Sequence, residues 1–266
     1  MRISNMRSGN LTTSPSPSVQ VFAIGGGGFT HPGDGWPEDA VLEDRLLALA
    51  GPAPSVRIGY IGHASNDHPD RITAFHERFR DCASATHLPM TADAEMAAAF
   101  LSELDIVYVG GGTTSAMLTL WQEKGLDHAI ACAARNGLIL SGVSAGAICW
   151  FEDLLLGTAE DGYALWPGMG LLKGSACPHY RNELPRKQSF DHHVLTGQLA
   201  PGIAIDDGVA VHIIDGVVAS VEHARDDGGD AFLVHADNTE VEITGVDNTG
   251  LKTEPLQPGF RLTSSR

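Results

Sequence analysis

The sequence predicts an α/β fold: a doubly wound, mostly parallel sheet with helices on both faces and a small antiparallel extension at the C-terminal end. Up to about residue 140, short apolar runs alternate with segments whose apolar residues recur at helical spacing. From about residue 203, short β-branched runs are separated by Asp-Gly turns, which favours hairpins over crossovers. No repeat or linker separates these parts, so we expect residues 19–266 to form one domain after a flexible segment, residues 1–18.

The first half of the chain supplies the elements of the parallel sheet. An apolar run at residues 19–24 is typical of a strand buried on both faces, and four glycines follow it. A helix is predicted next, with Pro37 near its start and Gly51 at its end. The elements predicted after it are strand 56–61, helix 69–82, helix 92–101, strand 105–109, helix 115–136 and strand 138–140. Such alternation implies right-handed crossovers between parallel strands.

The second half is predicted to form the antiparallel extension. Asp207-Gly208 and Asp215-Gly216 have the composition expected of hairpin turns. Further short strands are predicted at residues 231–235 and 240–244.

The charge balance limits the partners that the protein can bind. Acidic residues outnumber basic ones 33 to 17, which gives a formal net charge of −16 over 266 residues. Such a field repels phosphate backbones and anionic lipid, so neither nucleic acid nor a membrane surface is an expected partner. No apolar run approaches the roughly 18 residues that a membrane-spanning helix needs.

The chain start, the cysteines and the histidines also exclude several classes of protein. The first twenty residues are polar and lack the apolar core of a secretory signal. The four cysteines are 50, 17 and 28 positions apart, which fits free thiols in a cytoplasmic protein better than a disulfide framework or a metal knuckle. The twelve histidines show no metal-ligand spacing, so no metal is expected.

The strongest chemical signal lies between the strand at 138–140 and the segment after it. Residues 142–146 read Gly-Val-Ser-Ala-Gly, a G-x-S-x-G pattern between a predicted strand and a predicted helix. A sharp turn there holds the serine hydroxyl out at the carboxyl edge of the sheet, and the glycines remove side chains that would clash. Ser144 is therefore the candidate nucleophile, and the backbone N–H of Ala145 can face a developing oxyanion.

A second oxyanion donor is expected from the glycine run 110–112 at the end of the neighbouring strand. Glycines let the main chain approach a substrate carbonyl, and both strand ends lie at the same edge of a parallel sheet. The other glycine run, 25–28, lacks the G-x-G-x-x-G spacing and the acidic residue of a dinucleotide site. No cofactor is therefore expected.

A serine near neutral pH needs a base, and the best candidate is His179 in the segment Cys-Pro-His-Tyr. Four acids lie between serine and histidine: Glu152, Asp153, Glu160 and Asp161. The first two fall in the predicted helix after the serine and are expected to serve its solvent face or its packing. The last two lie in a predicted loop, free to reach an imidazole.

Taken together, these residues resemble the peptidase E family. This family comprises serine peptidases of the class I glutamine amidotransferase-like fold and includes aspartyl dipeptidases and the related cyanophycinases. The resemblance runs from about residue 21 to about residue 214. Four motifs carry it in order: VGGGTT at 109–114, GVSAGAICWFE at 142–152, CPHY at 177–180 and GIAIDDGVAV at 202–211.

The resemblance implies a role for several residues. Ser144 would be the nucleophile and His179 its base, with Gly112 and Ala145 forming the oxyanion hole. Asp161 is the preferred acid, and Glu160 stays open as the alternative. The pair Asp206 and Asp207 is read as turn and strand-end residues.

The resemblance also implies a substrate class. The expected reaction is hydrolysis of a short peptide through an acyl-enzyme, with a preference for an N-terminal aspartate. Arg186 lies where relatives place an arginine for that carboxylate, with Arg181 and Lys187 as substitutes. Gly111 and Thr113 would also contact substrate, although relatives often carry Asn where this chain has Thr113.

Two other functions remain open. One is a cyanophycinase-like, β-aspartyl or other small-peptide hydrolase of the same fold. The other is a catalytically silent binding protein. A glutamine amidotransferase subunit is disfavoured because those enzymes use cysteine where this chain has Ser144. Exposed helix faces on such a sheet allow a homodimer.

The cations themselves are unevenly distributed. Four of the 17 basic residues fall in the 15-residue stretch around the candidate histidine: Lys173, Arg181, Arg186 and Lys187. We therefore expect a local positive cluster at the site of an otherwise negative protein.

Overall fold

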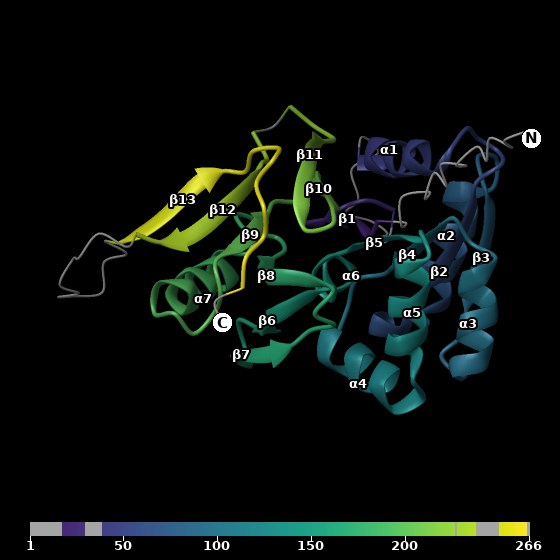
Figure 1. Cartoon of the computed structure of the whole chain (residues 1–266), viewed down its shortest axis with the longest axis horizontal. Coiled ribbons are helices and arrows are strands. Elements are labelled where there is room, and N and C mark those ends of the chain that lie inside the picture. Colours follow the sequence, from purple (N-terminus) through teal and green to yellow (C-terminus); the bar gives the residue numbers. More distant parts are fainter. Residues whose placement is uncertain (1–17, 30–38, 227, 238–249, 265–266) are drawn as a thin grey trace, which may run out of the picture.

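A computed structural model describes residues 18–29, 39–226, 228–237 and 250–264 of the chain. Two sheets lie side by side, the first covered by helices on both faces (Figure 1). The first seventeen residues and the strand predicted at 240–244 lie outside the described residues.

The first sheet has seven strands in the order β11-β10-β1-β5-β4-β2-β3. Its strands are β1 (Gln20–Ile24), β2 (Arg57–Ile61), β3 (Ser84–Leu88), β4 (Ile106–Val109), β5 (Ile139–Val143), β10 (Val209–Ile214) and β11 (Val217–His223). The five strands from β1 to β3 in this order are parallel. Beyond them β10 pairs with β1 and β11 pairs with β10, both antiparallel. The doubly wound parallel sheet with an antiparallel extension is therefore confirmed.

Alternation along β1 shows why both faces of this sheet are covered. Phe22 and Ile24 pack into one apolar cluster with α1 (Ala40–Ala50) and α2 (Pro69–Phe79). Val21 and Ala23 point the other way, because side chains alternate across a strand. The helices that cover this second face are α3 (Ala94–Ser102), α4 (Thr114–Lys124) and α5 (Leu126–Arg135).

The second sheet was not anticipated as a separate layer. It has six strands in the order β13-β12-β9-β8-β6-β7. They are β6 (Phe151–Thr158), β7 (Gly162–Pro167), β8 (Leu172–Cys177), β9 (Gly202–Ile205), β12 (Ala231–Ala236) and β13 (Leu251–Pro255), and α7 (Leu184–Leu195) connects β8 to β9. Leu154, Ala176 and Ile203 of this sheet share one core cluster with the parallel sheet, so a continuous apolar interior joins the two layers.

Several local predictions are corrected. The helix predicted at 115–136 is two helices, because Gly125 takes a left-handed φ of 71° between α4 and α5. The helix after Ser144, α6 (Ala145–Ile148), has only four residues, and β6 follows it almost at once. The polar strand β3 at the sheet edge was missed.

The two Asp-Gly turns also differ from each other. Asp215-Gly216 closes the β10–β11 hairpin as predicted. Asp207-Gly208 instead connects β9 in the second sheet to β10 in the first, so it is not a hairpin turn.

Candidate active site

Ser144 lies on a sharp turn between β5 and α6. Its backbone has a φ of 54°, an uncommon conformation for a residue with a side chain. Its N–H donates to the Ile24 carbonyl of β1 at 3.1 Å, which ties the turn to the neighbouring strand. A Cβ at Gly142 or Gly146 would lie 2.4 Å or 2.0 Å from the Val109 carbonyl oxygen. Both glycines of the motif are therefore needed for the turn to pack against β4.

His179 lies beside this serine. It follows β8, and its Nε2 is 2.9 Å from the Ser144 Oγ, whereas its Nδ1 is 2.6 Å from Oδ1 of Asp207. Because a carboxylate only accepts hydrogen bonds, Nδ1 carries the ring hydrogen and Nε2 accepts from the serine hydroxyl. The side chains of His179 and Asp207 are 12% and 28% exposed, so this relay is partly shielded from water.

The carboxylate at the histidine is thus Asp207, and the expectation for Asp161 or Glu160 is corrected. The reason is that α6 ends after one turn, so the acids assigned to a loop near the histidine lie instead at the tip of the β6–β7 hairpin. Asp161 bonds there to the hydroxyl of Thr158 at 3.0 Å. The sequence predicts only a turn or strand-end role for Asp207, whereas the structure places its carboxylate at His179.

The glycine run after β1 was also missed as part of the site. Gly26 forms a bridge with Asp207. A Cβ at this glycine would lie 1.9 Å from Oδ1 of Asp207 and 2.4 Å from Nδ1 of His179. The sequence carries the signal for this role, because the run follows a strand that neighbours the one leading into Ser144, although its glycines alone suggest only a dinucleotide motif.

The glycine run after β4 lies on the other side of Ser144. Gly112 has a φ of 142°, and a Cβ there would lie 2.1 Å from the Ala64 carbonyl oxygen. Two bonds fix this loop: the Thr113 N–H donates to Ala64 O at 2.7 Å, and Arg71 donates to Gly111 O at 2.7 Å. Gly111 therefore packs beside Ser144, where a Cβ would be 3.3 Å from the serine Cβ.

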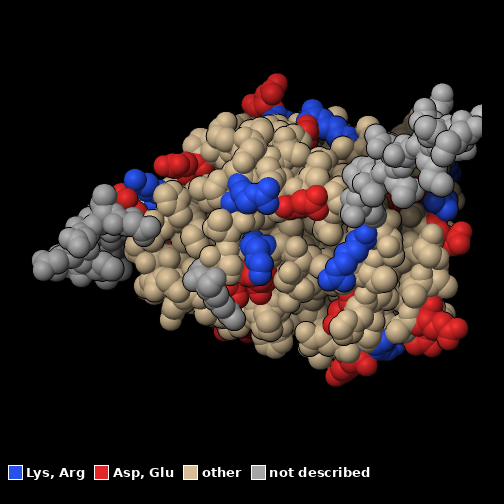
Figure 2. All heavy atoms as spheres, in the orientation of Figure 1, with Lys and Arg blue, Asp and Glu red and all other residues tan. Residues whose placement is uncertain are grey.

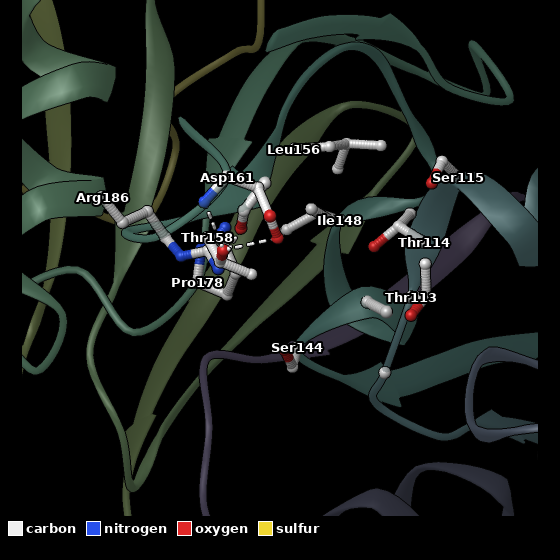
Figure 3. A pocket seen from close by; sticks show the side chains of 13 residues that line it. Thr113, Thr114, Ser115, Ser144, Ile148, Leu156, Thr158, Asp161, Pro178 and Arg186 are labelled. Carbon is white, nitrogen blue, oxygen red and sulfur yellow. Dashed lines mark hydrogen bonds between the residues drawn. The ribbon is translucent and has the colours of Figure 1, made fainter. Parts of the chain in front are cut away.

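A cavity of about 380 Å³ opens above the serine (Figure 3). One wall comes from the loop after β4 and the start of α4, and the other comes from the β6–β7 hairpin and α7. Its lining residues are Gly112, Thr113, Thr114, Ser115, Ser144, Ala145, Ile148, Leu156, Gly157, Thr158, Asp161, Pro178 and Arg186. Most of the expected site residues meet in this one pocket.

Arg186 is the cation of this pocket. Its side chain is 15% exposed and its Nε donates to Glu183 at 2.7 Å. One terminal nitrogen reaches the Gly157 carbonyl at 3.3 Å, and the guanidinium lies 5.5 Å from the ring centre of Tyr163. These contacts hold the side chain at the wall next to the hairpin tip.

The expected positive cluster does not form. Each of the four cations around His179 has a carboxylate partner: Lys173 with Glu152, Arg181 with Asp206, Arg186 with Glu183 and Lys187 with Asp191. Arg186 alone among these four lines the pocket. On the face drawn in Figure 2, blue and red side chains are likewise scattered rather than gathered by sign.

The two buried cysteines are poorly suited to act as nucleophiles. All four are free thiols, and both Cys149 and Cys177 are buried. Burial raises the pKa of the Cys149 and Cys177 thiols, which disfavours the reactive thiolate. Among the hydroxyl groups that line the pocket, that of Ser144 is hydrogen-bonded to His179.

Metal ligands and membrane helices were searched for in the described part of the chain. Within those residues, no three His, Cys, Asp or Glu side chains gather where they could hold a metal ion. No described helix combines the length and apolar character needed to cross a bilayer.

Comparison with known proteins places the chain in a family. The model of peptidase family S51 matches residues 21–221. The curated relative named uncharacterized peptidase YgaJ, from Bacillus subtilis (strain 168), is 36% identical over 221 residues, which are 81% of this chain and 91% of that protein.

Two solved structures share the fold. A peptidase from an acI-B1 Actinobacterium has a TM-score of 0.56 at 15% identity, over 81% of this chain and 95% of that one. A peptidase E candidate from Listeria monocytogenes EGD-e has a TM-score of 0.57 at 16% identity, over 77% and 98%. With most of its length matched by the family model, this chain belongs to peptidase family S51, the peptidase E family, and is a serine-type peptidase.

Proposed function

We propose that this peptidase hydrolyses short peptides with an N-terminal aspartate, through an acyl-enzyme on Ser144. The observation that carries the proposal is the relay from Asp207 through His179 to Ser144, which opens on a pocket with one guanidinium. In this scheme His179 takes the serine proton as Oγ attacks the scissile carbonyl, and then gives it to the leaving amine. Water releases the acyl group by the same route in reverse.

Asp207 supports the base in two ways. Its bond to Nδ1 fixes the tautomer in which Nε2 faces the serine, and its charge stabilises the imidazolium that forms during attack. The oxyanion would be held by the backbone N–H groups of Gly112 and Ala145, both of which border the pocket next to Ser144.

Substrate selection would rest on the two charged side chains of the pocket. Arg186 would bind the aspartate side-chain carboxylate, because its planar fork suits a carboxylate. Asp161 lies on the same hairpin wall (Figure 3) and would accept the α-ammonium group of the peptide. A pocket with one cation and one anion favours a small zwitterion over an internal segment of a protein. Thr113 would line the same subsite from the opposite wall.

A peptide panel tests this proposal. We expect rapid cleavage of α-Asp-X, at least about tenfold slower cleavage of neutral dipeptides, and none by Ser144→Ala. Faster cleavage of β-Asp-X would instead support a cyanophycinase-like or β-aspartyl hydrolase. Equal cleavage of acidic and neutral dipeptides would overturn the aspartate preference, and cleavage of none, together with no labelling by a fluorophosphonate, would support a silent binding protein.

A further inference from the structure

The residues that follow His179 are hydrogen-bonded to the residues that precede or include Asp207. Three bonds join the two segments in sequence: Tyr180 N–H to Ile205 O at 3.1 Å, Arg181 N–H to Asp206 Oδ1 at 2.9 Å, and Asp207 N–H to Asn182 Oδ1 at 3.0 Å. We call residues 180–182 and 205–207 the brace. It begins one residue after the base, His179, and ends at the carboxylate that contacts it, Asp207.

Asp206 is the side chain that holds the brace together. It is 3% exposed, and its two oxygens accept from the Arg181 N–H at 2.9 Å, the Arg181 Nε at 2.7 Å and the Asp230 N–H at 2.9 Å. Its carboxylate is directed at Arg181 and at the start of β12, while its neighbour Asp207 is directed at His179. Two adjacent aspartates therefore serve different partners.

Arg181 is itself fixed on the far side of the brace. Its guanidinium stacks on the Phe232 ring of β12 at 4.9 Å and donates to the Gly228 carbonyl. The side chain does not line the substrate pocket. Arg181, which the sequence suggested as a substitute substrate ligand, therefore has a structural role.

The base needs such support because its backbone is strained. His179 has a φ of 53°, a left-handed conformation that is unfavourable for a residue with a side chain. Asp207 lies on the crossover between two sheets, where strand pairing with a neighbour is limited to the bridge to Gly26. Neither residue belongs to a helix or strand that would hold it.

We propose that Asp206 is a positioning residue for the His179–Asp207 pair, and that Asn182 assists it by holding the Asp207 backbone. Asp206 acts through Arg181: by accepting from both its backbone N–H and its guanidinium, it fixes the chain two residues after the base. Asn182 and Asp206 thus keep Nδ1 of His179 hydrogen-bonded to Oδ1 of Asp207. This bond holds Nε2 where it accepts the proton of Ser144. This inference rests on the proposed serine chemistry.

The chain offers a matched control at the opposite end of the parallel sheet. There Asp105 accepts from the backbone N–H of Arg57 at 2.8 Å and from its guanidinium at 2.8 and 3.2 Å, which repeats the clamp of Asp206 on Arg181. Asp105→Asn breaks an equivalent clamp between β2 and β4 without touching the pocket. This variant shows whether losing any Asp–Arg clamp slows the reaction or whether only loss of the brace does.

The experiment measures the kinetics with which a fluorophosphonate labels the full-length protein, because this readout needs the nucleophile and its base but no peptide specificity. In Asp206→Asn one oxygen becomes an NH₂ group that cannot accept, so part of the clamp is lost. We expect the maximal labelling rate to fall about tenfold or more, with half-saturation changed less than about twofold. We expect Asn182→Ala to slow labelling by about threefold to tenfold, and Asp105→Asn to stay within about twofold of wild type.

The outcomes separate the two levels of inference. Wild-type-like labelling of Asp206→Asn, or an equal loss in Asp105→Asn, would overturn the brace while leaving the serine chemistry in place. Labelling that is absent in wild type, or equal in Ser144→Ala, would remove the proposed function itself. If Asp206→Asn shows no cooperative thermal unfolding, Asn182→Ala decides, and its labelling at the wild-type rate would overturn the proposal.

Discussion

Two pairs of adjacent acidic residues each contribute one carboxylate to the site, and they differ in how firmly they are held. Asp206 and Asp207 follow β9 and are bound by the chain on both sides, through Arg181 and through Gly26. Glu160 and Asp161 lie exposed at a hairpin tip. The first pair directs a carboxylate at His179, whereas the second brings Asp161 into the pocket.

The comparison shows which physical property suits a carboxylate to each task. A catalytic acid must keep a short, fixed bond to its histidine, so it needs a rigid frame. A carboxylate that receives substrate can lie on an exposed turn, because loops that contact ligands are held by the scaffold beneath them. Proximity to Ser144 in the sequence favours Glu160 and Asp161. The rigid contacts around Asp207 instead hold that carboxylate at His179.

Among the substitutions that test this comparison, Asp207→Ala should have the largest effect. Removing this carboxylate frees the histidine to adopt the wrong tautomer, so kcat should fall about 10³- to 10⁴-fold. Asp161→Ala should lower kcat by less than about tenfold. Steady-state kinetics on α-Asp-X peptides measures both, and the reverse order would show that the hairpin supplies the acid after all.

Gly26→Ala tests the frame around the first pair. The added methyl would lie within 2 Å of Oδ1 of Asp207 and must push the carboxylate or the histidine away. We expect kcat to fall about 100-fold, as for a misplacement of about 1 Å. Gly216→Ala in the β10–β11 hairpin serves as the control, because its Cβ meets nothing within 4 Å although its φ of 74° makes it costly for stability. An equal loss of kcat in both variants at temperatures below their unfolding would contradict the role of Gly26.

Arg186→Ala tests the pocket side of the comparison. Loss of a charge-assisted hydrogen bond should lower kcat/KM for α-Asp-X by about 10- to 100-fold and leave neutral dipeptides within about threefold. Lys173→Ala is the control, because this lysine is 62% exposed and outside the pocket. If both peptide classes lose activity alike, Arg186 is structural and does not select aspartate.

Asp161→Asn sharpens the role of the hairpin carboxylate. Without its charge, KM for a peptide with a free amino terminus should rise about three- to tenfold. An N-acetylated peptide, which carries no ammonium, should bind the variant and the wild type alike. Glu160→Gln, on the same turn, should leave KM unchanged for both the free and the acetylated peptide. A parallel rise in KM for acetylated and free peptides would argue against an ammonium subsite.

Glu43 is a buried carboxylate that does not line the pocket at Ser144. It is 1% exposed on α1, and burial raises its pKa to about 7 from an ordinary value of 4.5, despite the nearby Arg78. Between these two pH values the folded protein holds a proton that the unfolded chain has lost, so stability falls as pH rises from about 4.5 to 7.

Glu43→Gln should therefore have the smallest effect on activity. We expect kcat to stay within about twofold of wild type. The free energy of unfolding of wild type should fall by about 3 kcal/mol as pH rises from 4.5 to 7, and this fall should be absent in the variant. Denaturant unfolding at several pH values measures it. A wild-type stability that rises over this range would contradict the raised pKa, and a large loss of kcat would give Glu43 a part in catalysis.

The sequence predicted the parallel sheet because apolar runs and helical periodicity are local signals. It also singled out Ser144 and His179, since G-x-S-x-G between a strand and a helix has few other uses. It could not predict the second sheet, because the pairing of β8 with β6 and with β9 depends on contacts distant along the chain.

The acid was missed for a related reason. Asp207 carries the local signature of a turn, Asp-Gly, and nothing nearby in the sequence shows that this turn crosses between sheets beside Gly26. The same holds for the cations around His179. Their density in the sequence was real, but the carboxylates that neutralise them, such as Asp206 for Arg181, become partners only in the folded chain.

The most direct test of the account is the rate at which a fluorophosphonate labels wild type, Ser144→Ala, Asp207→Ala and Asp161→Ala. We predict labelling of wild type, none of Ser144→Ala, a rate reduced about 10³-fold in Asp207→Ala, and a near wild-type rate in Asp161→Ala. Slow labelling of Asp161→Ala together with unchanged labelling of Asp207→Ala would contradict the assignment of Asp207 as the acid of this peptidase.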